Sequence, residues 1–254
     1  MQLSLKAAVI EVQETALLTV RSIRGAFRRP YYFRDTLIQM DHVGVGSLTI
    51  VILTGFFTGG VLTLQSSDEM SRFGAVGLTG SLVSVALVRE LGPVLAALMV
   101  AGRVGSGMAS ELGSMKVTEQ INAMRALGTD PIKKLVVPRL LATVIMQPLL
   151  TIVADGFGII GGLAVARGML RISPNLYLSS AWDGLDYYDI LGGGLIKPLV
   201  FGAIVAIVSC RCGLRTEGGT QGVGRSTTQA VVASSVLILV SDFLLTRIIL
   251  IYTP

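Results

Sequence analysis

The sequence predicts an all-α integral membrane protein, in which an amino-terminal interfacial amphipathic helix precedes five transmembrane helices. Of its 254 residues, 52% are hydrophobic and only 15% are charged, and the mean hydropathy is +0.71. These values lie well outside the usual balance of a soluble domain. Five stretches also approach the roughly 20 residues that a helix needs to cross a bilayer. Nothing resembles a second soluble domain, so we expect a single domain over residues 1–254.

Residues 1–30 have the pattern of an amphipathic helix. Glu11 and Glu14 interrupt what would be the apolar core of a signal peptide, so we expect the helix to lie on the membrane surface. Arg28, Arg29 and Arg34 follow it and favour the cytoplasmic side. The apolar positions repeat at a helical period and are Leu5, Val9, Val12, Ala16, Val20, Ile23 and Phe27.

Five apolar stretches are the predicted transmembrane spans. They cover residues 44–65, 74–102, 140–166, 190–210 and 226–251. The first contains Gly55-x-x-x-Gly59 and the third contains Gly158-x-x-x-Gly162. Small residues at this spacing let two helices approach closely, although each match alone is a weak signal.

The loops between the spans predict the orientation. Residues 103–139 and 211–225 are rich in lysine and arginine, whereas residues 66–73 and 167–196 carry more acidic than basic residues. Basic loops favour the cytoplasm. We therefore expect a cytoplasmic amino terminus and a carboxyl terminus on the opposite side.

Six charged residues fall inside predicted spans: Arg89, Glu90, Asp155, Lys197, Asp242 and Arg247. A charge at mid-bilayer costs about 2.5–3.5 kcal/mol on insertion scales, so such residues normally face protein or a wet cavity. Arg89 and Glu90 are adjacent and do not face each other on a helix, so each needs a partner elsewhere. Two interpretations of these charged residues remain open: they form ion pairs between helices, or they form a polar patch that accepts a charged lipid head group.

Residues 118–128 predict a short helix between the second and third spans. Thr118 is a suitable N-cap, and Gly128 followed by Pro131 supplies a stop. Three apolar residues share one face, namely Ile121, Met124 and Leu127. So short an apolar face must dock on something, either the rest of this chain or a partner protein.

No catalytic or metal-binding constellation is evident. The sequence has one histidine, His42, and two cysteines, Cys210 and Cys212, which are too few for a usual structural zinc site. Residues 219–226 nearly match a nucleotide-binding P-loop, but Arg225 replaces its lysine and the segment lies between two spans, so we expect a flexible turn there. A membrane chain without an energy-coupling site of its own suggests a permease driven by a separate ATPase.

The residues from Leu87 to Pro138 closely resemble the MlaE/YrbE permease family of ABC transporters, which move phospholipids between bacterial inner and outer membranes. The matching motifs are RELGP (Arg89–Pro93), AGR-x-GS (Ala101–Ser106), E-x-G-x-M (Glu111–Met115), TEQ (Thr118–Gln120), Asp130-Pro131 and Pro138-Arg139. Further matches are Leu64-Gln65, Ile196-Lys197, G-x-x-RSTT-x-x-VV-x-SS across residues 222–235, and Asp242-Phe243. The resemblance covers most of the chain.

This resemblance implies an MlaE-type permease fold and a homodimer in the bacterial inner membrane, serving outer-membrane lipid asymmetry. The implied partners are a cytoplasmic ABC ATPase, which would bind ATP and Mg in place of this chain, a periplasmic ring of MCE-domain (MlaD-like) subunits, and a small STAS-domain (MlaB-like) subunit. Residues 118–128 correspond to the coupling helix, with Glu111, Glu119, Met124 and Leu127 as expected ATPase contacts. The expected lipid cavity has Leu62, Gln65, Glu90 and Leu91, and the expected buried polar residues are Arg89, Lys197 and Asp242. The direction of transport does not follow from the resemblance.

Two other functions fit the same pattern of spans. A non-transporting membrane scaffold would use the buried charges as structural pairs. An ion-coupled secondary transporter would use Glu90 and Asp242 as proton carriers, but five spans without an internal repeat disfavour it.

Overall fold

A computed structural model describes residues 5–252, together with the side chains of residues 10 and 12–251. Within this part of the chain every regular element is helical, which confirms the all-α prediction. The predictions for residues 1–4 and 253–254, and for the side chains of Leu5, Val9 and Glu11, lie outside the described residues. The α-helices are α1 (Leu5–Ala26), α2 (Phe33–Arg72), α3 (Thr79–Ala86), α4 (Gly92–Val100), α5 (Ser106–Val117), α6 (Gln120–Ala126), α7 (Val137–Gly168), α8 (Pro174–Asp183), α9 (Tyr187–Leu191), α10 (Lys197–Leu214) and α11 (Gly219–Tyr252). A 3₁₀ turn (Val76–Leu78) and the π-helical segments Leu87–Leu91, Ala101–Gly105, Ile132–Val136 and Gly192–Ile196 connect several of them.

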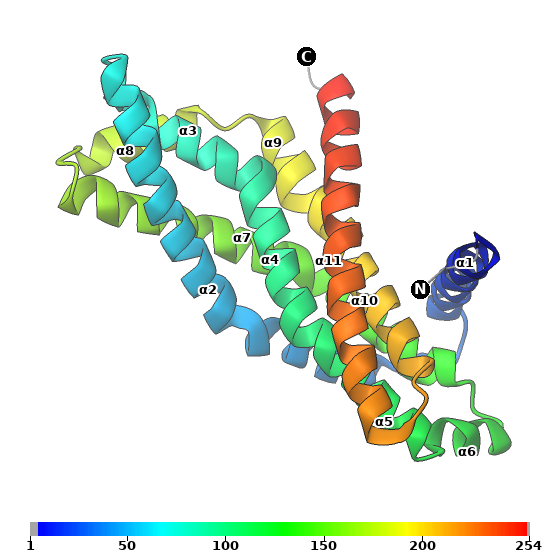
Figure 1. Ribbon diagram of the computed structural model, residues 1–254. Coiled ribbons are helices and arrows are strands. Elements are labelled where there is room, and N and C mark those ends of the chain that lie inside the picture. The colour runs from blue at the N-terminus through cyan, green and yellow to red at the C-terminus, as the bar shows by residue number, and fades with distance from the viewer. Residues whose placement is uncertain (1–4, 253–254) are drawn as a thin grey trace. The chain divides into compact units, whose positions relative to one another are not determined.

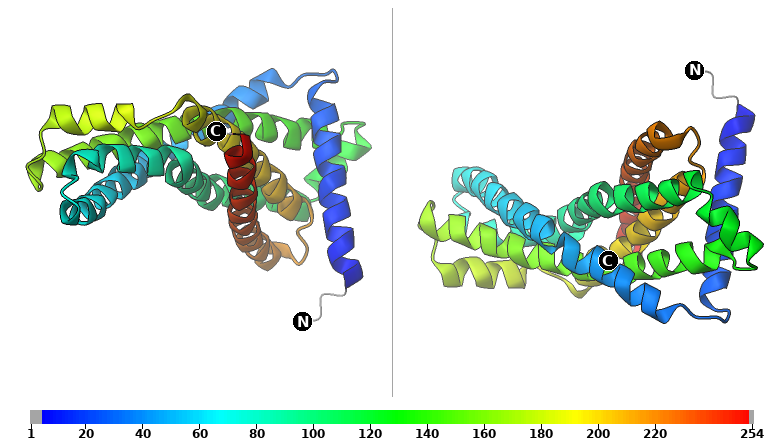
Figure 2. Two further views of the ribbon diagram at one scale, coloured as in Figure 1. Left: turned by 90° about the horizontal axis from the view of Figure 1, so that it is seen from above. Right: turned by 90° about the horizontal axis from the view of Figure 1, so that it is seen from below.

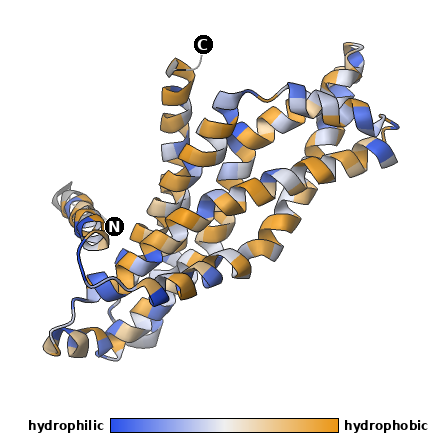
Figure 3. Ribbon diagram, turned by 180° about the vertical axis from the view of Figure 1, so that it is seen from behind, coloured by the Kyte–Doolittle hydropathy of each residue, from blue (hydrophilic) through white to orange (hydrophobic). Residues whose placement is uncertain are grey.

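Five helical segments are long and apolar enough to cross a membrane, as the sequence predicts. They are Phe33–Arg72, Val76–Val117, Ile132–Gly168, Tyr187–Leu214 and Gly219–Ile251. Each is longer than its predicted span, because hydropathy marks only the apolar part of a helix that continues through polar residues. Figure 3 shows hydrophobic residues predominating along the long helices and hydrophilic residues gathering near several of their ends.

The chain divides into two compact units by its internal contacts, and the single domain expected from the sequence stays a prediction. The first unit comprises Met1–Val43, Val100–Ile145 and Gly202–Leu237, and the second comprises Gly44–Met99, Met146–Phe201 and Ile238–Pro254. Each passage between them falls inside α2, α4, α7, α10 or α11. Because no linker marks these boundaries, composition alone does not reveal them.

In the first unit, α1 packs against other helices of the same chain. α1 packs on the π-helical segment Ile132–Val136 (Figure 2). Glu14 forms an ion pair with Arg215 at 3.3 Å, and Ser22 is fully buried. The predicted apolar residues Val12, Val20 and Phe27 remain exposed. α1 therefore buries polar and small residues together with Leu18, which packs on two core clusters, and leaves several of its predicted apolar residues exposed.

The second unit contains two close helix contacts. α3 and α8 lie side by side (Figure 1). α2 and α7 meet through glycines: a Cβ added at Gly55 would overlap the carbonyl oxygen of Ala154, and one added at Gly59 would overlap that of Gly158. Both small-residue motifs predicted from the sequence thus lie at one helix–helix contact.

Tyr177 joins α8 to the α2–α7 contact. Its side chain is buried, and its hydroxyl lies 3.1 Å from that of Thr63, which in turn donates to the carbonyl oxygen of Gly59 at 2.9 Å. Burial raises the pKa of Tyr177, and the hydrogen bond with Thr63 lowers it in part. A raised pKa in the folded state means that the neutral phenol contributes stability below about pH 10 and that this contribution is lost as the pH rises further.

We expect Tyr177→Phe to lower stability by about 1 kcal/mol at neutral pH, because one buried hydrogen bond is lost. Above about pH 10 the difference should shrink, since only the wild type must ionise a buried phenol. Thermal unfolding in detergent as a function of pH measures both effects. If the stability difference between wild type and Tyr177→Phe stayed constant as the pH rose above 10, the Tyr177 hydroxyl would not be buried as the structure shows.

Candidate functional site

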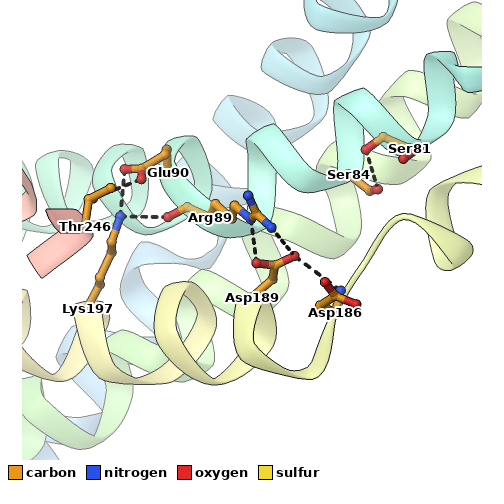
Figure 4. Close-up of polar contacts among 8 residues, drawn as sticks. All are labelled: Ser81, Ser84, Arg89, Glu90, Asp186, Asp189, Lys197 and Thr246. Atoms are coloured by element: carbon orange, nitrogen blue, oxygen red, sulfur yellow. Dashed lines mark hydrogen bonds and ion pairs between the residues drawn. The ribbon is translucent and has the colours of Figure 1, made fainter. Parts of the chain in front are cut away.

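A charged cluster in the second unit begins at the π-helical segment Leu87–Leu91. In a regular α-helix the carbonyl oxygen of Arg89 would accept a hydrogen bond from the amide of residue 93, but Pro93 has no N–H. The Nζ atom of Lys197, the first residue of α10, donates to this carbonyl oxygen at 2.8 Å instead (Figure 4). A backbone group freed by a proline thus becomes part of the site.

Lys197 is the centre of the cluster. Its Nζ atom lies 2.7 Å from Oε2 of Glu90 and 3.0 Å from Oδ1 of Asp242 on α11. An ammonium group has three hydrogens, and with the carbonyl oxygen of Arg89 it has three oxygen atoms within 3.0 Å. The side chain of Lys197 is 2% exposed, so these oxygens replace the water that it loses on burial.

Glu90 is held at both carboxylate oxygens. Lys197 contacts Oε2, and the hydroxyl of Thr246 on α11 donates to Oε1 at 2.9 Å. Glu90 is 38% exposed and Asp242 is 18% exposed, so the carboxylates are more accessible than the lysine between them. The cluster therefore presents carboxylate oxygen rather than the ammonium to its surroundings.

Arg89 turns away from Glu90 and pairs with Asp189 on α9. Its Nε atom lies 2.5 Å from Oδ1 and its Nη2 atom 3.1 Å from Oδ2, a two-point geometry that fixes the guanidinium plane. Oδ2 of Asp189 also accepts from the backbone amide of Asp186, within the capping box of α9. Figure 4 shows the two adjacent residues directed to different partners.

Arg89 is not the buried residue that the sequence predicts. Its side chain is 45% exposed, while its partner Asp189 is 5% exposed. The long arginine side chain reaches outward and its carboxylate partner lies inside, because α9 brings Asp189 under it. The sequence places Asp189 in an acidic loop; the signal that could have found it is the need of Arg89 for a carboxylate.

A small pocket adjoins the cluster. It has a volume of about 40 Å³, and its lining includes the charged residues Arg89, Glu90, Asp189 and Lys197 together with Gly193, Ile249 and Leu250. Gly193 is required here, because a Cβ would overlap the carbonyl oxygen of Val88 where two π-helical segments meet. Such segments are frequent at functional sites. A volume of this size holds no more than a few waters, so this part of the chain does not enclose a lipid by itself.

The other expected cavity residues do not line this pocket. Leu62 is half-buried and Gln65 is exposed, both on α2, and Leu91 is half-buried at the end of its π-helical segment. The structure brings Glu90, Lys197 and Asp242 together, and it leaves Leu62, Gln65 and Leu91 outside this pocket.

The predicted helix over residues 118–128 is shorter, covering Gln120–Ala126 as α6. The prediction that Thr118 caps it is wrong. Thr118 ends α5, its hydroxyl donates to the carbonyl oxygen of Ser114 at 2.9 Å, and Glu119 adopts a left-handed conformation (φ 62°) before α6. The sharp turn at Glu119 starts a new helix without a side-chain cap.

The predicted stop after α6 is confirmed. Gly128 has φ 76°, and its amide donates to the carbonyl oxygen of Arg125 at 3.0 Å. The amide of Thr129 donates to the carbonyl oxygen of Met124 at 2.9 Å. These two bonds form a Schellman motif, in which glycine permits the left-handed residue.

The side chains of α6 divide between the chain and its surroundings. Ile121 is fully buried in a core cluster with Leu112, Leu135, Val136 and Cys210, and Met124 packs at the edge of that cluster. Leu127 is 83% exposed, and Glu119 is exposed and accepts from the side chain of Asn122. Glu111 on α5 pairs with the buried Arg139 at 2.7 Å, so it has a partner within its own chain.

The P-loop-like segment is not a flexible turn. Residues 219–226 form the first turns of α11, and Ser226 accepts a hydrogen bond from the hydroxyl of Thr216 at 2.8 Å. Amides in a continuous helix cannot wrap around a phosphate as a P-loop does. Among the side chains that the structure describes (residues 10 and 12–251), no group of three or more His, Cys, Asp or Glu could hold a metal ion.

Comparison with known proteins places these features in a family. The model of the Permease MlaE family matches residues 36–248, which include the whole charged cluster and α6. A protein of Rickettsia typhi named "probable ABC transporter permease protein" is 44% identical over 92% of this chain and 90% of its own length. A Synechocystis protein with the same descriptive name is 45% identical over 84% of this chain and 80% of its own length. Protein TRIGALACTOSYLDIACYLGLYCEROL 1, chloroplastic, of Arabidopsis thaliana is 41% identical over 84% of this chain and 61% of its own length. The chain belongs to the MlaE permease family.

Proposed function

We propose that this chain is the membrane-spanning subunit of an ABC transporter that moves phospholipids between the inner and outer membranes of a bacterium and serves outer-membrane lipid asymmetry. The observation that carries the proposal is the charged cluster beside apolar walls, within candidate membrane spans. Glu90 and Arg89 are partly exposed there, and Ile249 and Leu250 lie next to them. Apolar walls suit acyl chains, and the polar groups orient a head group.

The lipid cavity is proposed to form between two copies of the chain. The most apolar window of α11 is 11% buried, against 28–56% for the other four candidate spans. Val232, Val236, Val240 and Phe243 are exposed at helical spacing, and the same helix supplies Asp242 and Thr246 to the cluster. A two-fold axis beside α11 would bury this face and enlarge the small pocket. Leu62, Gln65 and Leu91 would complete the cavity with Glu90.

Energy for transport is proposed to come from a separate cytoplasmic ATPase, which binds ATP and Mg. The relatives named as ABC transporter permeases support this division of labour. α6 would be the coupling helix, with Leu127, Met124 and Glu119 toward the ATPase. A periplasmic MCE-domain ring and a small STAS-domain subunit are the further proposed partners. The amino terminus is proposed to be cytoplasmic and the carboxyl terminus periplasmic.

The proposal is tested by purifying the tagged chain from its native membrane and reconstituting the complex in vesicles with a labelled phospholipid. We expect mass spectrometry to identify an ATPase in equal amount, an MCE-domain protein and bound phospholipid. ATP should then drive lipid transfer. A complex that moves no lipid would favour a scaffold, and lipid movement that follows a proton gradient without ATP would favour a secondary transporter.

Leu127→Asp is expected to release the ATPase. Leu127 is the most exposed apolar residue of the α6 region, so a charge there should weaken docking at least tenfold and leave the fold intact. Co-purification and the melting temperature measure the two effects. Phe73→Asp, which changes a similarly exposed residue just after α2, is the control and should retain the ATPase. Normal ATPase stoichiometry in Leu127→Asp would contradict the docking role.

A further inference from the structure

An apolar groove in the first unit has a lining that shares no residue with the charged cluster. It has a volume of about 250 Å³ and runs between the end of α1, the start of α2 and the start of α7. Its walls include Leu37, Met40, Leu141 and Ile145, and Tyr31 stands among the residues at the α1–α2 junction. A groove with such walls accepts hydrocarbon.

A basic pocket continues this groove. It has a volume of about 340 Å³ and contains Arg21, Arg24 and Arg28 of the α1 region. Gly25 and Lys133 line both spaces, so the apolar groove and the basic pocket are adjacent parts of one site. Gly25 lets α1 approach α7, since a Cβ there would lie 3.0 Å from Cγ2 of Val137.

Most of the positive charge of the pocket has no ion-pair partner among the side chains that the structure describes. Within the part of the chain that the structure describes, Arg21, Arg24 and Arg28 form no ion pair. Asp130 is the one carboxylate among the lining residues that the structure describes, and its Oδ1 accepts from the backbone amide of Ile132 at 2.9 Å. Lys133 donates to a neutral group, the carbonyl oxygen of Arg29, at 3.2 Å. Several cations therefore face one engaged carboxylate.

We propose that this composite site binds one anionic phospholipid, with an acyl chain in the groove and its phosphate among Arg24, Arg28 and Lys133. Charge complementarity requires an anion, and the adjoining apolar groove requires that the anion carry hydrocarbon. The chain has five candidate membrane spans, so phospholipid is its constant neighbour. Basic pockets next to membrane helices are a known means of binding anionic head groups. The bound lipid links α1 to α2 and α7, and none of its contacts belongs to the charged cluster.

The first test uses native mass spectrometry of the full chain released from detergent micelles that contain equal amounts of dioleoylphosphatidylglycerol and dioleoylphosphatidylcholine. The two probes have the same acyl chains and differ in head-group charge. We expect one phosphatidylglycerol per chain to be retained at least tenfold over phosphatidylcholine. Equal retention of the two lipids would overturn the proposal without any variant.

Variants then locate the site. Arg24→Gln with Lys133→Gln should lower phosphatidylglycerol retention roughly 25-fold, about fivefold for each cation removed. Lys116→Gln with Arg125→Gln removes the same charge from the same unit outside both spaces and should retain the lipid. Leu37→Asn should weaken binding through the groove while leaving the cations in place. An equal loss in the Lys116 and Arg125 pair would mean diffuse attraction, and displacement of the lipid by 10 mM inorganic phosphate would mean an anion site without the groove; either result would overturn the proposal.

Discussion

Lys197→Met is expected to lower the stability of the chain by about 3 kcal/mol, because removing one partner of a buried ion pair leaves its counter-charges unpaired. Lys197 contacts Glu90, Asp242 and the carbonyl oxygen of Arg89, and all three lose the ammonium group at once, while Glu90 keeps the hydroxyl of Thr246. For a chain of this size the loss corresponds to a melting temperature roughly 6–12 °C lower. We also expect lipid transfer in reconstituted vesicles to fall to background, since α10, α11 and the Leu87–Leu91 segment lose their shared contact.

Two further variants separate charge pairing from a general loss of cation. Arg247→Met removes an exposed cation from α11, five residues after Asp242, and should leave the melting temperature within 1–2 °C of wild type. Adding Glu90→Gln to Lys197→Met should recover part of the lost stability, because one unpaired carboxylate is gone. An unchanged melting temperature in Lys197→Met would show that the cluster does not hold these helices together.

The sequence predicts this cluster in part. Adjacent charges on a helix must find separate partners, and Arg89 and Glu90 do so. The identity of the second partner does not follow, because Asp189 lies in a segment that hydropathy assigns to a loop and that folds as α9. The hydrogen bond from Lys197 to the carbonyl oxygen of Arg89 follows from the structure and not from the sequence. Pro93 shows which carbonyl group lacks its helical donor, but not which side chain reaches it.

Local signals at α6 have the same limit. The glycine stop at Gly128 follows from its need for a left-handed conformation, and the structure confirms it. Thr118 has the right side chain for an N-cap, but it is the C-cap of α5, and its hydroxyl donates a hydrogen bond to the carbonyl oxygen of Ser114 in α5. Tertiary packing decides the start of α6, because burial of Ile121 places the helix. A short segment therefore shows its end more reliably than its beginning.

The glycine motifs on α2 and α7 are weak signals in the sequence, and the structure shows that they contact each other. Gly55 and Gly59 on α2 and Gly158 on α7 are matched only by spacing in the sequence, which does not say that they meet. In the structure the backbones of α2 and α7 touch at Gly55 and Gly59, where a Cβ would overlap carbonyl oxygens of Ala154 and Gly158. Backbone atoms cannot move aside as a flexible side chain can, so the contact requires glycine.

Gly59→Ala is therefore expected to separate α2 from α7 and to destabilise the chain by several kcal/mol, although alanine favours helix by about 1 kcal/mol over glycine. Gly156→Ala is the matched control: Gly156 also lies in the second unit on α7, and a Cβ there meets nothing within 4 Å. Gly156→Ala should thus raise or preserve the melting temperature. Gly59→Ala should lower it by roughly 10 °C or more. Thermal unfolding of both variants in detergent measures the difference. Helix propensity favours alanine over glycine equally at both positions. Equal melting temperatures of the two variants would therefore mean that α2 and α7 pack further apart than the structure places them.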